Sequence, residues 1–483
     1  MTRFLALLLL CGSALAQTTT TVPITVTATP TGVTLSMPTT VILVPTCPAA
    51  PASTTATITC PTGTAGSWKQ TTAYSASPYP ACWTAVLSPT AAPAGACTAV
   101  STALSIKVSG NRLVNQAGAV VQLRGVNVSG LEGVAMQGWD PSDPYGGQYP
   151  NFTALASWKI NAIRVPLNED SWLGLTTYDW PVAPATVGVA RKADPGGNYR
   201  ATVLKVVNAA TAAGLYVILD LHITSPSAVV PGISGTVPTS AQQQAPMADA
   251  SNSIAFWTSL ASTYKAYPNV IFDLFNEPHI DGFTGVTGGA DATAWNVLLN
   301  GGTGTTFFPG STVAAGQNGG AVTTVTQNWQ SAGMQQLLNA VRATGATNVC
   351  MVAGLEYALN MSLWTKYVPV DPLKQIAASW HGYANPSNNT QPQISTSFAD
   401  VQGILAAGYP VVTGETGDYV TPLSAATWFP VLLPWADANG VSVLAWTWNV
   451  WPQPQNVLIL TTTGTPNLGE GAVYQKWTVN HAP

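Results

Sequence analysis

The chain has 483 residues, of which only 7% are charged, and its formal net charge is −4. A chain of this length can bury a large core, but soluble proteins ordinarily carry about 25% charged residues. No run of lysine or arginine is present, which argues against nucleic-acid binding, and the composition indicates a surface of Thr, Ser, Asn, Gln and Gly that suits an extracellular protein.

The first residues have the pattern of an export signal. A basic start at Arg3 precedes the apolar run Phe4–Cys11, and Ala14-Leu15-Ala16 fits the small-x-small pattern of a cleavage site. The apolar run is far shorter than the roughly 20 residues that span a bilayer. We therefore predict a signal peptide over 1–16, secretion to the extracellular space, and no insertion into a membrane.

Residues 17–100 are rich in Thr, Pro and Ala and contain no acidic residue, and 18–45 alternates in a way that suits β-structure or an extended stalk. Four of the cysteines lie here, at Cys47, Cys60, Cys82 and Cys97. In an exported protein they predict two disulfides, with three connectivities open. The aromatic residues are Trp68, Tyr74, Tyr79 and Trp83. They suit a sugar-binding face or a small core, and a spacer or surface-attachment role is the favoured interpretation.

After residue 100 the sequence changes to apolar runs separated by turn residues. Short strands over 104–108, 112–114 and 119–123 predict a hairpin that closes the floor of a barrel. Eight strand-like runs recur, most of them apolar on successive residues, as in parallel strands covered on both sides. The runs are Val121–Val128, Ala162–Leu167, Tyr216–Leu221, Val270–Phe275, Asn348–Ala353, Ile376–Trp380, Pro410–Thr413 and Val441–Trp448. Cys350, inside the fifth run, is expected to be a buried small hydrophobe.

Helix-compatible segments lie between several of these runs, at Tyr199–Ala213, Ser253–Tyr267 and Asn328–Ala343. Eight strand–helix units over residues 101–483 predict an α/β fold, the (β/α)8 or TIM barrel, with loop insertions such as Gly301–Gly320. A doubly wound open sheet is the alternative, but no glycine-rich phosphate-binding fingerprint follows an early strand.

Polar residues follow the predicted strands, where a barrel of this type places its active site. The chain has only six glutamates, and four of them fall at or just beyond strand ends. A carboxylate directly after a run such as Val270–Phe275 is costly unless a partner or a function justifies it. The polar and aromatic groups at the strand ends are Arg164, His222, Asn276, Glu277, Glu356, His381, Tyr383, Glu415, Trp448 and Asn449.

Two of these segments resemble motifs of glycoside hydrolase family 5, whose members are barrel glycosidases. The segment 270–279, which reads Val-Ile-Phe-Asp-Leu-Phe-Asn-Glu-Pro-His, resembles the strand-four signature of the family. The segment 411–417, Val-Val-Thr-Gly-Glu-Thr-Gly, resembles its strand-seven motif. The similarity runs in order over about 104–477. Further matches are Leu123–Asn127, Ile163–Pro166, Val217–His222, Trp380–Tyr383 and Trp446–Asn449.

The resemblance implies a retaining mechanism, with Glu277 as general acid/base and Glu415 as nucleophile. The two glutamates must then differ in protonation state at rest. The resemblance also implies that Arg164 keeps Glu415 ionised and that Tyr383 hydrogen-bonds it.

The remaining predicted site residues bind the sugar. The resemblance implies that Asn276 contacts the substrate 2-hydroxyl and that His222 and His381 line the acid/base side and the sugar next to the scissile bond. Trp448 is expected to offer a flat apolar face to a pyranose ring.

Structural alternatives stay open for several residues. Arg164 suits a bridge between buried acids, the two histidines suit the core, and Glu356 and Asp418 are rivals of Glu415. Glu169 and Asp170 suit either distal subsites or a solvated loop. Residues for which a cleft platform and a core position are both open are Trp139, Trp172, Tyr357, Trp364 and Trp446.

Other chemistries find little support in the sequence. There are four histidines and no HExxH or HxH pair, which argues against metal catalysis, and no GxSxG elbow or dinucleotide fingerprint is present. We therefore expect neither a metal nor a cofactor. Asn-x-Ser/Thr sequons begin at Asn127, Asn151, Asn360 and Asn388, and Asn127 is expected inside the barrel mouth.

The predicted function is that of a secreted, monomeric, retaining endo-β-1,4-glucanase acting on β-linked polysaccharide. β-Mannanase, xylanase and exo-β-glucosidase activities are the alternatives within the same chemistry, and a non-catalytic carbohydrate-binding protein is the rival from another class. After Trp448-Asn449 the chain reads Val-Trp-Pro-Gln-Pro-Gln, where many cellulases of the family have an acidic-Lys pair. The sequence therefore leaves the choice of sugar open.

Overall fold

A computed structural model describes the side chains of residues 104–133, 149–176, 192–227, 245–280, 283, 286, 291–304, 328–384, 397–418, 426–450 and 457–481, and the backbone of further strands. The chain divides into two compact units, Met1–Ala103 and Leu104–Pro483. In the described part of the chain, no helix is both long enough and apolar enough to cross a bilayer.

The unit Met1–Ala103 forms antiparallel strands in two sheets, ordered β1-β2-β3-β5 and β4-β7-β6. The strands are β1 (Leu5–Leu9), β2 (Thr20–Thr29), β3 (Gly32–Pro38), β4 (Ile42–Leu43), β5 (Thr55–Thr59), β6 (Trp68–Ala73) and β7 (Trp83–Pro89). Strands β2, β3 and β4 lie within the alternating stretch 18–45. The cysteine and aromatic side chains of this unit lie outside the described residues, so the disulfides, the sugar-binding face and the signal cleavage remain predictions.

In the unit Leu104–Pro483, eight parallel strands close into a barrel in chain order. They are β11 (Arg124–Asn127), β12 (Ala162–Asn168), β15 (Tyr216–Ile223), β18 (Val270–Asp273), β21 (Cys350–Ala353), β22 (Ile376–His381), β23 (Val411–Glu415) and β24 (Ser442–Ala445). Strand β11 pairs with both β12 and β24, which closes the ring. Each strand overlaps one of the eight predicted runs, so the predicted (β/α)8 barrel is confirmed.

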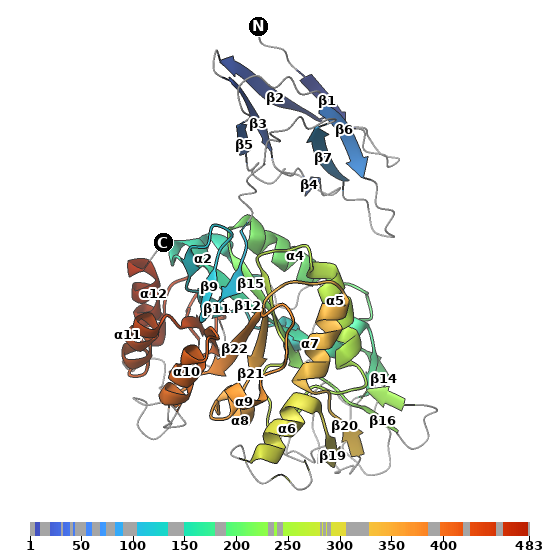
Figure 1. The fold of residues 1–483 in the computed structure, drawn as a ribbon, viewed down its shortest axis with the longest axis vertical. Helices are drawn as coiled ribbons and strands as arrows, with labels where there is room; N and C mark the ends of the chain where they lie inside the picture. The colour runs from blue at the N-terminus through green and yellow to red at the C-terminus, as the bar shows by residue number, and fades with distance from the viewer. Residues whose placement is uncertain are drawn as a thin grey trace. The chain divides into compact units, whose positions relative to one another are not determined.

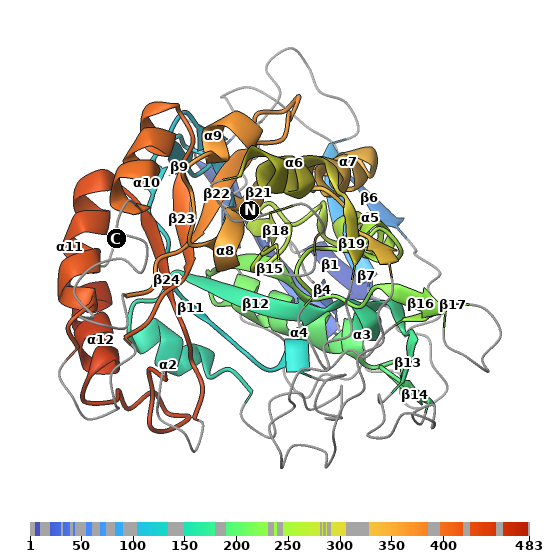
Figure 2. The same cartoon turned by 90° about the horizontal axis from the view of Figure 1, so that it is seen from below.

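Helices surround the ring of strands (Figures 1 and 2). The helices are η1 (Leu131–Gly133), α2 (Phe152–Ser157), α3 (Glu169–Leu173), α4 (Tyr199–Ala212), α5 (Ser253–Tyr264), α6 (Ala292–Asn300), α7 (Met334–Ala343), α8 (Leu355–Ala358), α9 (Trp364–Tyr367), α10 (Ser397–Ala406), α11 (Phe429–Asn439) and α12 (Glu470–Asn480). Loop strands pair as β13 (Thr176–Tyr178) with β14 (Ala190–Lys192), β16 (Ser227–Val229) with β17 (Thr236–Pro238), and β19 (Thr303–Thr305) with β20 (Asn328–Gln330).

One predicted helix begins later than its sequence pattern indicates. Residues 328–330 form β20, and α7 begins only at Met334. The backbone N–H of Gly333 donates to the Gln336 side chain over 2.9 Å, which caps the helix at this point. Pairing of β20 with the distant β19 therefore overrides the local helical pattern.

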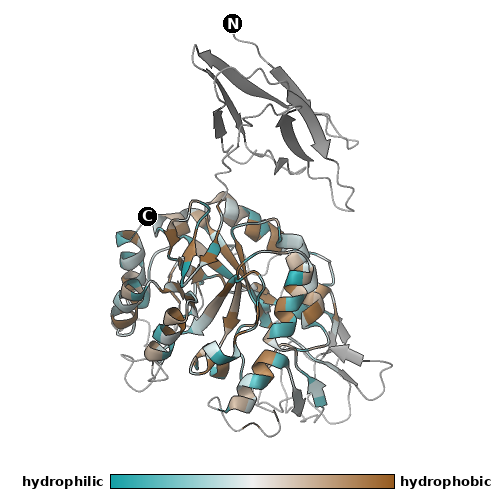
Figure 3. Ribbon diagram, viewed as in Figure 1, coloured by the Kyte–Doolittle hydropathy of each residue, from teal (hydrophilic) through white to brown (hydrophobic). Residues whose placement is uncertain are grey.

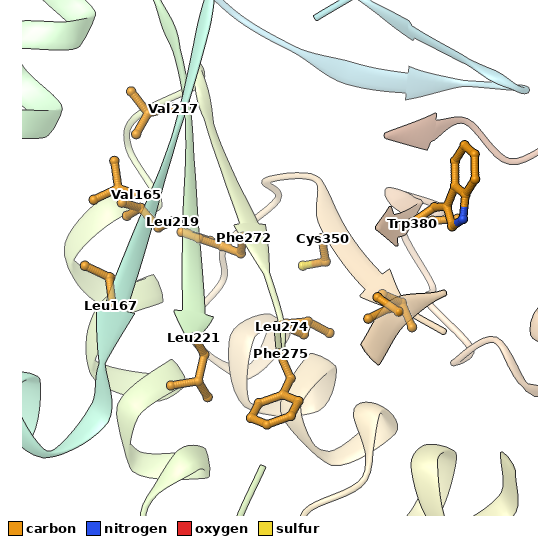
Figure 4. Packing of buried hydrophobic residues seen from close by; sticks show 14 of the residues in the cluster. Val165, Leu167, Val217, Leu219, Leu221, Phe272, Leu274, Phe275, Cys350 and Trp380 are labelled. Atoms are coloured by element: carbon orange, nitrogen blue, oxygen red, sulfur yellow. The ribbon is translucent and has the colours of Figure 1, made fainter. Parts of the chain in front are cut away.

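The alternation of side chains along the strands separates two layers of the barrel wall. Val165, Val217 and Phe272 belong to the cluster that packs under the helices, and Figure 4 shows their side chains. The brown colour of the barrel strands in Figure 3 marks their hydrophobic residues. Ile218 and Ile271, one residue away, point to the interior and pack at its floor. Because side chains alternate between the two faces of a strand, the residues two positions further toward the carboxyl ends also point to the interior.

The floor is closed by the predicted hairpin, which forms a three-stranded sheet of β8 (Lys107–Ser109), β9 (Arg112–Val114) and β10 (Val120–Val121). Ile106, next to β8, packs into the floor cluster, and its backbone N–H donates to the carbonyl of Pro268 over 2.9 Å. Cys350 is buried as predicted, and burial raises the pKa of its thiol to about 12.

Candidate active site

Arg164 lies at the centre of the barrel mouth, on β12, and its side chain is fully buried. Its Nε lies 3.0 Å from Asp273 Oδ2, its Nη2 lies 3.0 Å from Asp220 Oδ2, and its Nη1 lies 2.7 Å from Glu415 Oε1. Burial lowers the pKa of this guanidinium, but the three surrounding carboxylates outweigh burial and raise it. One fixed cation therefore neutralises part of a cluster of three acids.

Glu415 ends β23 and is 5% exposed. Besides the Arg164 ion pair, its second oxygen accepts a hydrogen bond from the Tyr383 hydroxyl over 3.1 Å. A carboxylate with a cation on one oxygen and a donor on the other is held ionised and in a single orientation. Arg164 and Tyr383 thus contact Glu415 as predicted, and their catalytic roles stay predictions.

Glu277 follows β18 and is more open, with a fifth of its side chain exposed. Its Oε1 lies 2.9 Å from Nδ1 of His381, and the same nitrogen lies 3.7 Å from Glu415 Oε2. One atom from each of these three side chains lies within 4.8 Å of the others. The structure thus brings the two predicted catalytic carboxyls together on either side of a buried imidazole.

The two predicted histidines differ in charge. Burial lowers the pKa of His381 to about 4, so its imidazole is neutral beside the two glutamates. Burial also lowers the pKa of His222, but a 2.7 Å hydrogen bond to Asp220 outweighs it and raises this pKa to about 9. His222 is therefore a candidate cation at the edge of the site and His381 is not.

Two asparagines complete the hydrogen bonding of Arg164. Asn276 Oδ1 accepts from its Nη2 over 2.8 Å, and Asn127 Oδ1 accepts from its Nη1 over 3.1 Å. Nδ2 of Asn276 also lies 3.3 Å from Nε2 of His222. The side chain of Asn276 is thereby fixed next to Glu277.

Trp448 does not occupy the predicted place. It is 4% exposed and packs edge to face against Trp158, with ring centroids 4.8 Å apart, so it belongs to the core. Trp446, two residues earlier in the chain, is only partly buried. Its ring stacks on that of His222, with centroids 5.8 Å apart and planes at 16°. The structure thus places the indole of Trp446, and not that of Trp448, beside the site residues.

A second aromatic pair lies next to Glu277. The ring of Tyr357 stacks on His279 with centroids 4.4 Å apart, and Tyr357 is 42% exposed. The backbone of Glu356, Tyr357 and Ala358 is left-handed, with φ of 51°, 61° and 59°. Three such residues in a row are costly for side chains other than glycine, and the strain places Tyr357 over the segment that carries Glu277.

Comparison with known proteins gives the family of this chain. The family model "Cellulase (glycosyl hydrolase family 5)" matches residues 114–451. The chain belongs to glycosyl hydrolase family 5.

Relatives of known name include "Major extracellular endoglucanase" of Xanthomonas campestris pv. campestris, 31% identical over 208 residues, or 41% of this chain and 37% of the relative. "Manganese dependent endoglucanase Eg5A" of Phanerodontia chrysosporium is 26% identical over 296 residues, or 59% of each chain. The chain thus spans less than two thirds of either relative. Among solved structures, a β-glucanase of Saccharophagus degradans in complex with cellotetraose has a TM-score of 0.51, 21% identity, and coverage of 79% of this chain and 95% of its own, and it shows the same fold.

In this family 5 barrel, two residues that the sequence analysis did not single out are essential neighbours of Arg164. Asp220 and Asp273 are fully buried, and burial raises the pKa of Asp273 to about 7 although Arg164 lowers it. Each lies within two residues of the end of a predicted strand. Because side chains alternate between the two faces of a strand, each also points to the barrel interior. That periodicity is the signal that could have identified them.

The remaining candidates are mostly structural. Trp172 and Trp364 are core residues, at 1% exposure each. Asp418 accepts backbone hydrogen bonds from Trp428 and its neighbours and so shapes a turn. Glu169 and Asp170 are buried, so neither reaches a distal subsite nor lies in a solvated loop.

The sequon residues lie in different surroundings. Asn127 is fully buried at the barrel mouth, which excludes a glycan there in the folded protein. The Asn151 side chain caps α2. Trp139 and Asn388 lie outside the described residues.

Proposed function

We propose that this chain is a secreted, retaining endo-β-1,4-glucanase. The observation that carries the proposal is the pair of carboxyls, with an oxygen of Glu277 within 4.8 Å of one of Glu415. Retaining glycosidases hold their two carboxyl groups about 5–5.5 Å apart, whereas inverting enzymes leave roughly 6.5–9.5 Å for a water molecule. The short separation favours direct attack by a carboxylate.

In the first step, Glu277 gives its proton to the glycosidic oxygen while Glu415 Oε2 or Oε1 forms a bond to the anomeric carbon, and the bond to the leaving sugar breaks. Arg164 and Tyr383 hold Glu415 ionised and aimed, as their contacts with its two oxygens indicate. In the second step, Glu277 takes a proton from water, whose oxygen adds to the same carbon and releases Glu415. The charge on each glutamate is restored.

Three aromatic or imidazole groups fit the sugar-binding roles. Trp446 offers a partly exposed indole beside His222 for the sugar that is attacked. Tyr357 offers an exposed ring beside Glu277, on the side from which the leaving sugar departs. Neutral His381 adds no positive charge next to Glu277, so it does not oppose the proton that the acid must carry.

A substrate panel tests the reaction and the sugar. Carboxymethyl-cellulose, mixed-linkage glucan, mannan and xylan are supplied to the full chain, and products are resolved by length. A ladder from the glucans supports the proposal, and a ladder from mannan or xylan alone would replace glucan as the substrate. Release of monosaccharide only would overturn endo action.

The stereochemistry tests the mechanism directly. NMR of the first products should show the β-anomer, because two inversions restore the configuration. The matched controls are Glu277→Gln and Glu415→Gln, which should abolish product formation, and Glu470→Gln, a buried glutamate away from the pair that should retain it. An α-anomer would rule out the double displacement.

The N-terminal unit is proposed to be a spacer or a surface attachment. Its support is compositional: residues 17–100 lack acidic residues and are rich in Thr and Pro. Retention of the full chain on cellulose is compared with that of residues 101–483. Equal retention supports a spacer, and stronger retention of the full chain would identify a binding module.

A further inference from the structure

Tyr357 is the most exposed aromatic residue that the structure describes, at 42%. It lies on α8, the short turn after β21, and β21 pairs with β18, the strand that leads to Glu277. Leu355 and Ala358, on either side of it in the turn, are fully buried. A large ring left in solvent beside a proposed catalytic acid is typical of a surface that binds a ligand.

The turn around Tyr357 has a strained, left-handed backbone that its surroundings enforce. Two backbone hydrogen bonds between Leu355 and Asn360, over 3.1 and 2.9 Å, hold its ends together. The backbone N–H of Tyr357 donates to the carbonyl of Pro278 over 3.0 Å, which joins the turn to the segment that carries Glu277. Left-handed residues other than glycine persist only where the fold imposes them, and they gather at functional sites.

His279 fixes the orientation of the Tyr357 ring. The two rings stack with centroids 4.4 Å apart and planes at 17°. The backbone N–H of His279 donates to the carbonyl of Pro246 over 2.8 Å, and its Nδ1 lies 3.2 Å from the backbone carbonyl oxygen of Glu277. The phenol ring is therefore supported by an imidazole that is itself held on the Glu277 segment.

The barrel places two aromatic rings beside different members of the carboxyl pair. Tyr357 follows β21, next to the strand of Glu277, whereas Trp446 follows β24, which pairs with the strand of Glu415. In a retaining hydrolysis the acid protonates the oxygen of the leaving sugar, and the nucleophile attacks the other sugar. The ring beside Glu277 thus has the position of a contact to the leaving sugar.

We propose that Tyr357, supported by His279, binds the sugar on the leaving-group side and selects a sugar there in both steps of the reaction. The inference rests on the double displacement proposed above. In the first step, the ring favours leaving groups that are sugars over those that lack a ring. In the second step, it favours a sugar acceptor over water, so that the chain also transfers glycosyl units to sugars.

Transfer needs no group beyond those already in the site. A hydroxyl oxygen of the acceptor sugar forms a bond to the anomeric carbon, the bond from this carbon to Glu415 breaks, and Glu277 takes the hydroxyl proton. The product is a β-linked oligosaccharide, and both glutamates regain their starting charge. Water follows the same course to the hydrolysis product, so a sugar held on Tyr357 shifts the ratio of the two products.

Two substrates test the first step in the full chain. β-Cellobiosyl fluoride forms the same intermediate as cellotetraose, since its C–F bond breaks as the bond to Glu415 forms and fluoride takes the proton of Glu277, but its leaving group has no ring. Tyr357→Gly removes the aromatic ring, and glycine adopts a left-handed backbone without strain. This variant should lower kcat/KM about 10-fold for cellotetraose, as expected for a lost aromatic contact, and change it less than about two-fold for the fluoride.

Two further variants serve as controls. Tyr357→Phe keeps the ring and should keep most of the rate on both substrates. Val370→Ala removes another exposed apolar side chain, from the connection that enters β22 at the floor of the barrel, and should change neither rate. A parallel loss on both substrates in Tyr357→Gly would indicate disturbed carboxyls instead of a lost sugar contact, and would overturn the inference.

An acceptor tests the second step. The fluoride is supplied with glucose, and the ratio of cellotriose, the transfer product, to cellobiose, the hydrolysis product, is measured by chromatography. The ratio should rise with glucose in the parent and in Tyr357→Phe, and it should be several-fold lower in Tyr357→Gly. Equal ratios in the three proteins would overturn the inference.

The two proposals fail in different ways. A parent that hydrolyses neither cellotetraose nor the fluoride would overturn the proposed function, and this inference with it. A parent that hydrolyses both, with no change on cellotetraose in Tyr357→Gly, would overturn the role of Tyr357 alone.

Discussion

Two groups of buried acids lie at one end of the barrel, and they are neutralised in different ways. Asp220, Asp273 and Glu415 surround Arg164, which contacts all three at 3.0 Å or less. Glu169, Asp170 and Asp249, which we call the acid triad, are the second group, and they form no ion pair with a cation of the described residues. The first group has its counter-charge in the chain itself, whereas burial raises the pKa of all three carboxyls of the second and favours their neutral, protonated form.

The difference shows what each group can do. A guanidinium is always charged, so Glu415 has a fixed positive partner at 2.7 Å, as a nucleophilic carboxylate requires. A group that lacks such a cation gains and loses protons with the pH of its medium. Such a group is suited to stability and unsuited to the chemical step.

The largest expected effect separates the two groups by activity. Glu415→Gln removes the nucleophile of the first group and should lower kcat by roughly 10⁴-fold or more, the order found when a nucleophile is deleted. Asp249→Asn in the acid triad should leave kcat within a few-fold of the parent. Initial rates on carboxymethyl-cellulose measure both, and a comparable loss in the two variants would erase the distinction.

Replacement of Arg164, the cation of the first group, should lower the free energy of unfolding more than the other substitutions. Arg164→Met leaves Asp273 buried without a charge partner, which typically destabilises a protein by about 3–5 kcal/mol. Arg164→Lys keeps the charge but loses the planar fork, and we expect a smaller loss. Urea unfolding measures the free energies. Equal stability of Arg164→Met and the parent would show that Asp273 is protonated rather than ion-paired.

The two histidines should make the free energy of unfolding depend on pH in opposite directions. His381 should lower it on the acid side and His222 on the alkaline side. His381, with its pKa lowered to about 4, stays neutral in the fold while the unfolded imidazole takes a proton below about 6.5, so stability falls as pH drops from there toward 4. His222, with its pKa raised to about 9, keeps its proton longer, so its contribution is complete below about 6.5 and is lost as pH rises through 9.

Each limb is worth about 3.5 kcal/mol at most, at about 1.4 kcal/mol for each unit of pKa shift. The free energy of unfolding is measured against pH in the parent, His381→Asn and His222→Asn. The acid limb should flatten in the first variant and the alkaline limb in the second. A variant that flattened neither limb would contradict the assignment of charge to these histidines.

The smallest effect concerns the second oxygen of Glu415. Tyr383→Phe removes one hydrogen bond to a charged group, worth about 1.5–3 kcal/mol, and should lower kcat/KM roughly 10–100-fold with the fold intact. The control is Tyr264→Phe, because that buried hydroxyl has no partner in the structure and its loss should change little. Comparable losses in both variants would remove Tyr383 from the site.

Much of the fold and of the candidate site can be predicted from the sequence, because the patterns that indicate them involve residues close together in the chain. The eight apolar runs coincide with the barrel strands, since a strand covered on both faces must be apolar on successive residues. Asn276, Glu277 and Glu415 follow such runs directly, and the structure brings the two glutamates to either side of His381.

The tertiary structure decided what depends on distant neighbours. Only the closed barrel brings Asp220 and Asp273 to Arg164, although the alternation of each strand had already turned them inward. Trp448 packs on Trp158 in the core, whereas Trp446 lies at the site. The two tryptophans have similar neighbours in the sequence, so the sequence does not tell which of them faces the site.

The same holds for the acid triad and for β20. Glu169 and Asp170 have the local sequence of an exposed turn, and their burial follows from the connection that carries Asp249. Residues 328–330 have a helical pattern and become a strand because β19 lies beside them. Periodicity and strand ends are properties of a few neighbouring residues, whereas burial, ion pairing and register depend on which distant segments the fold brings together.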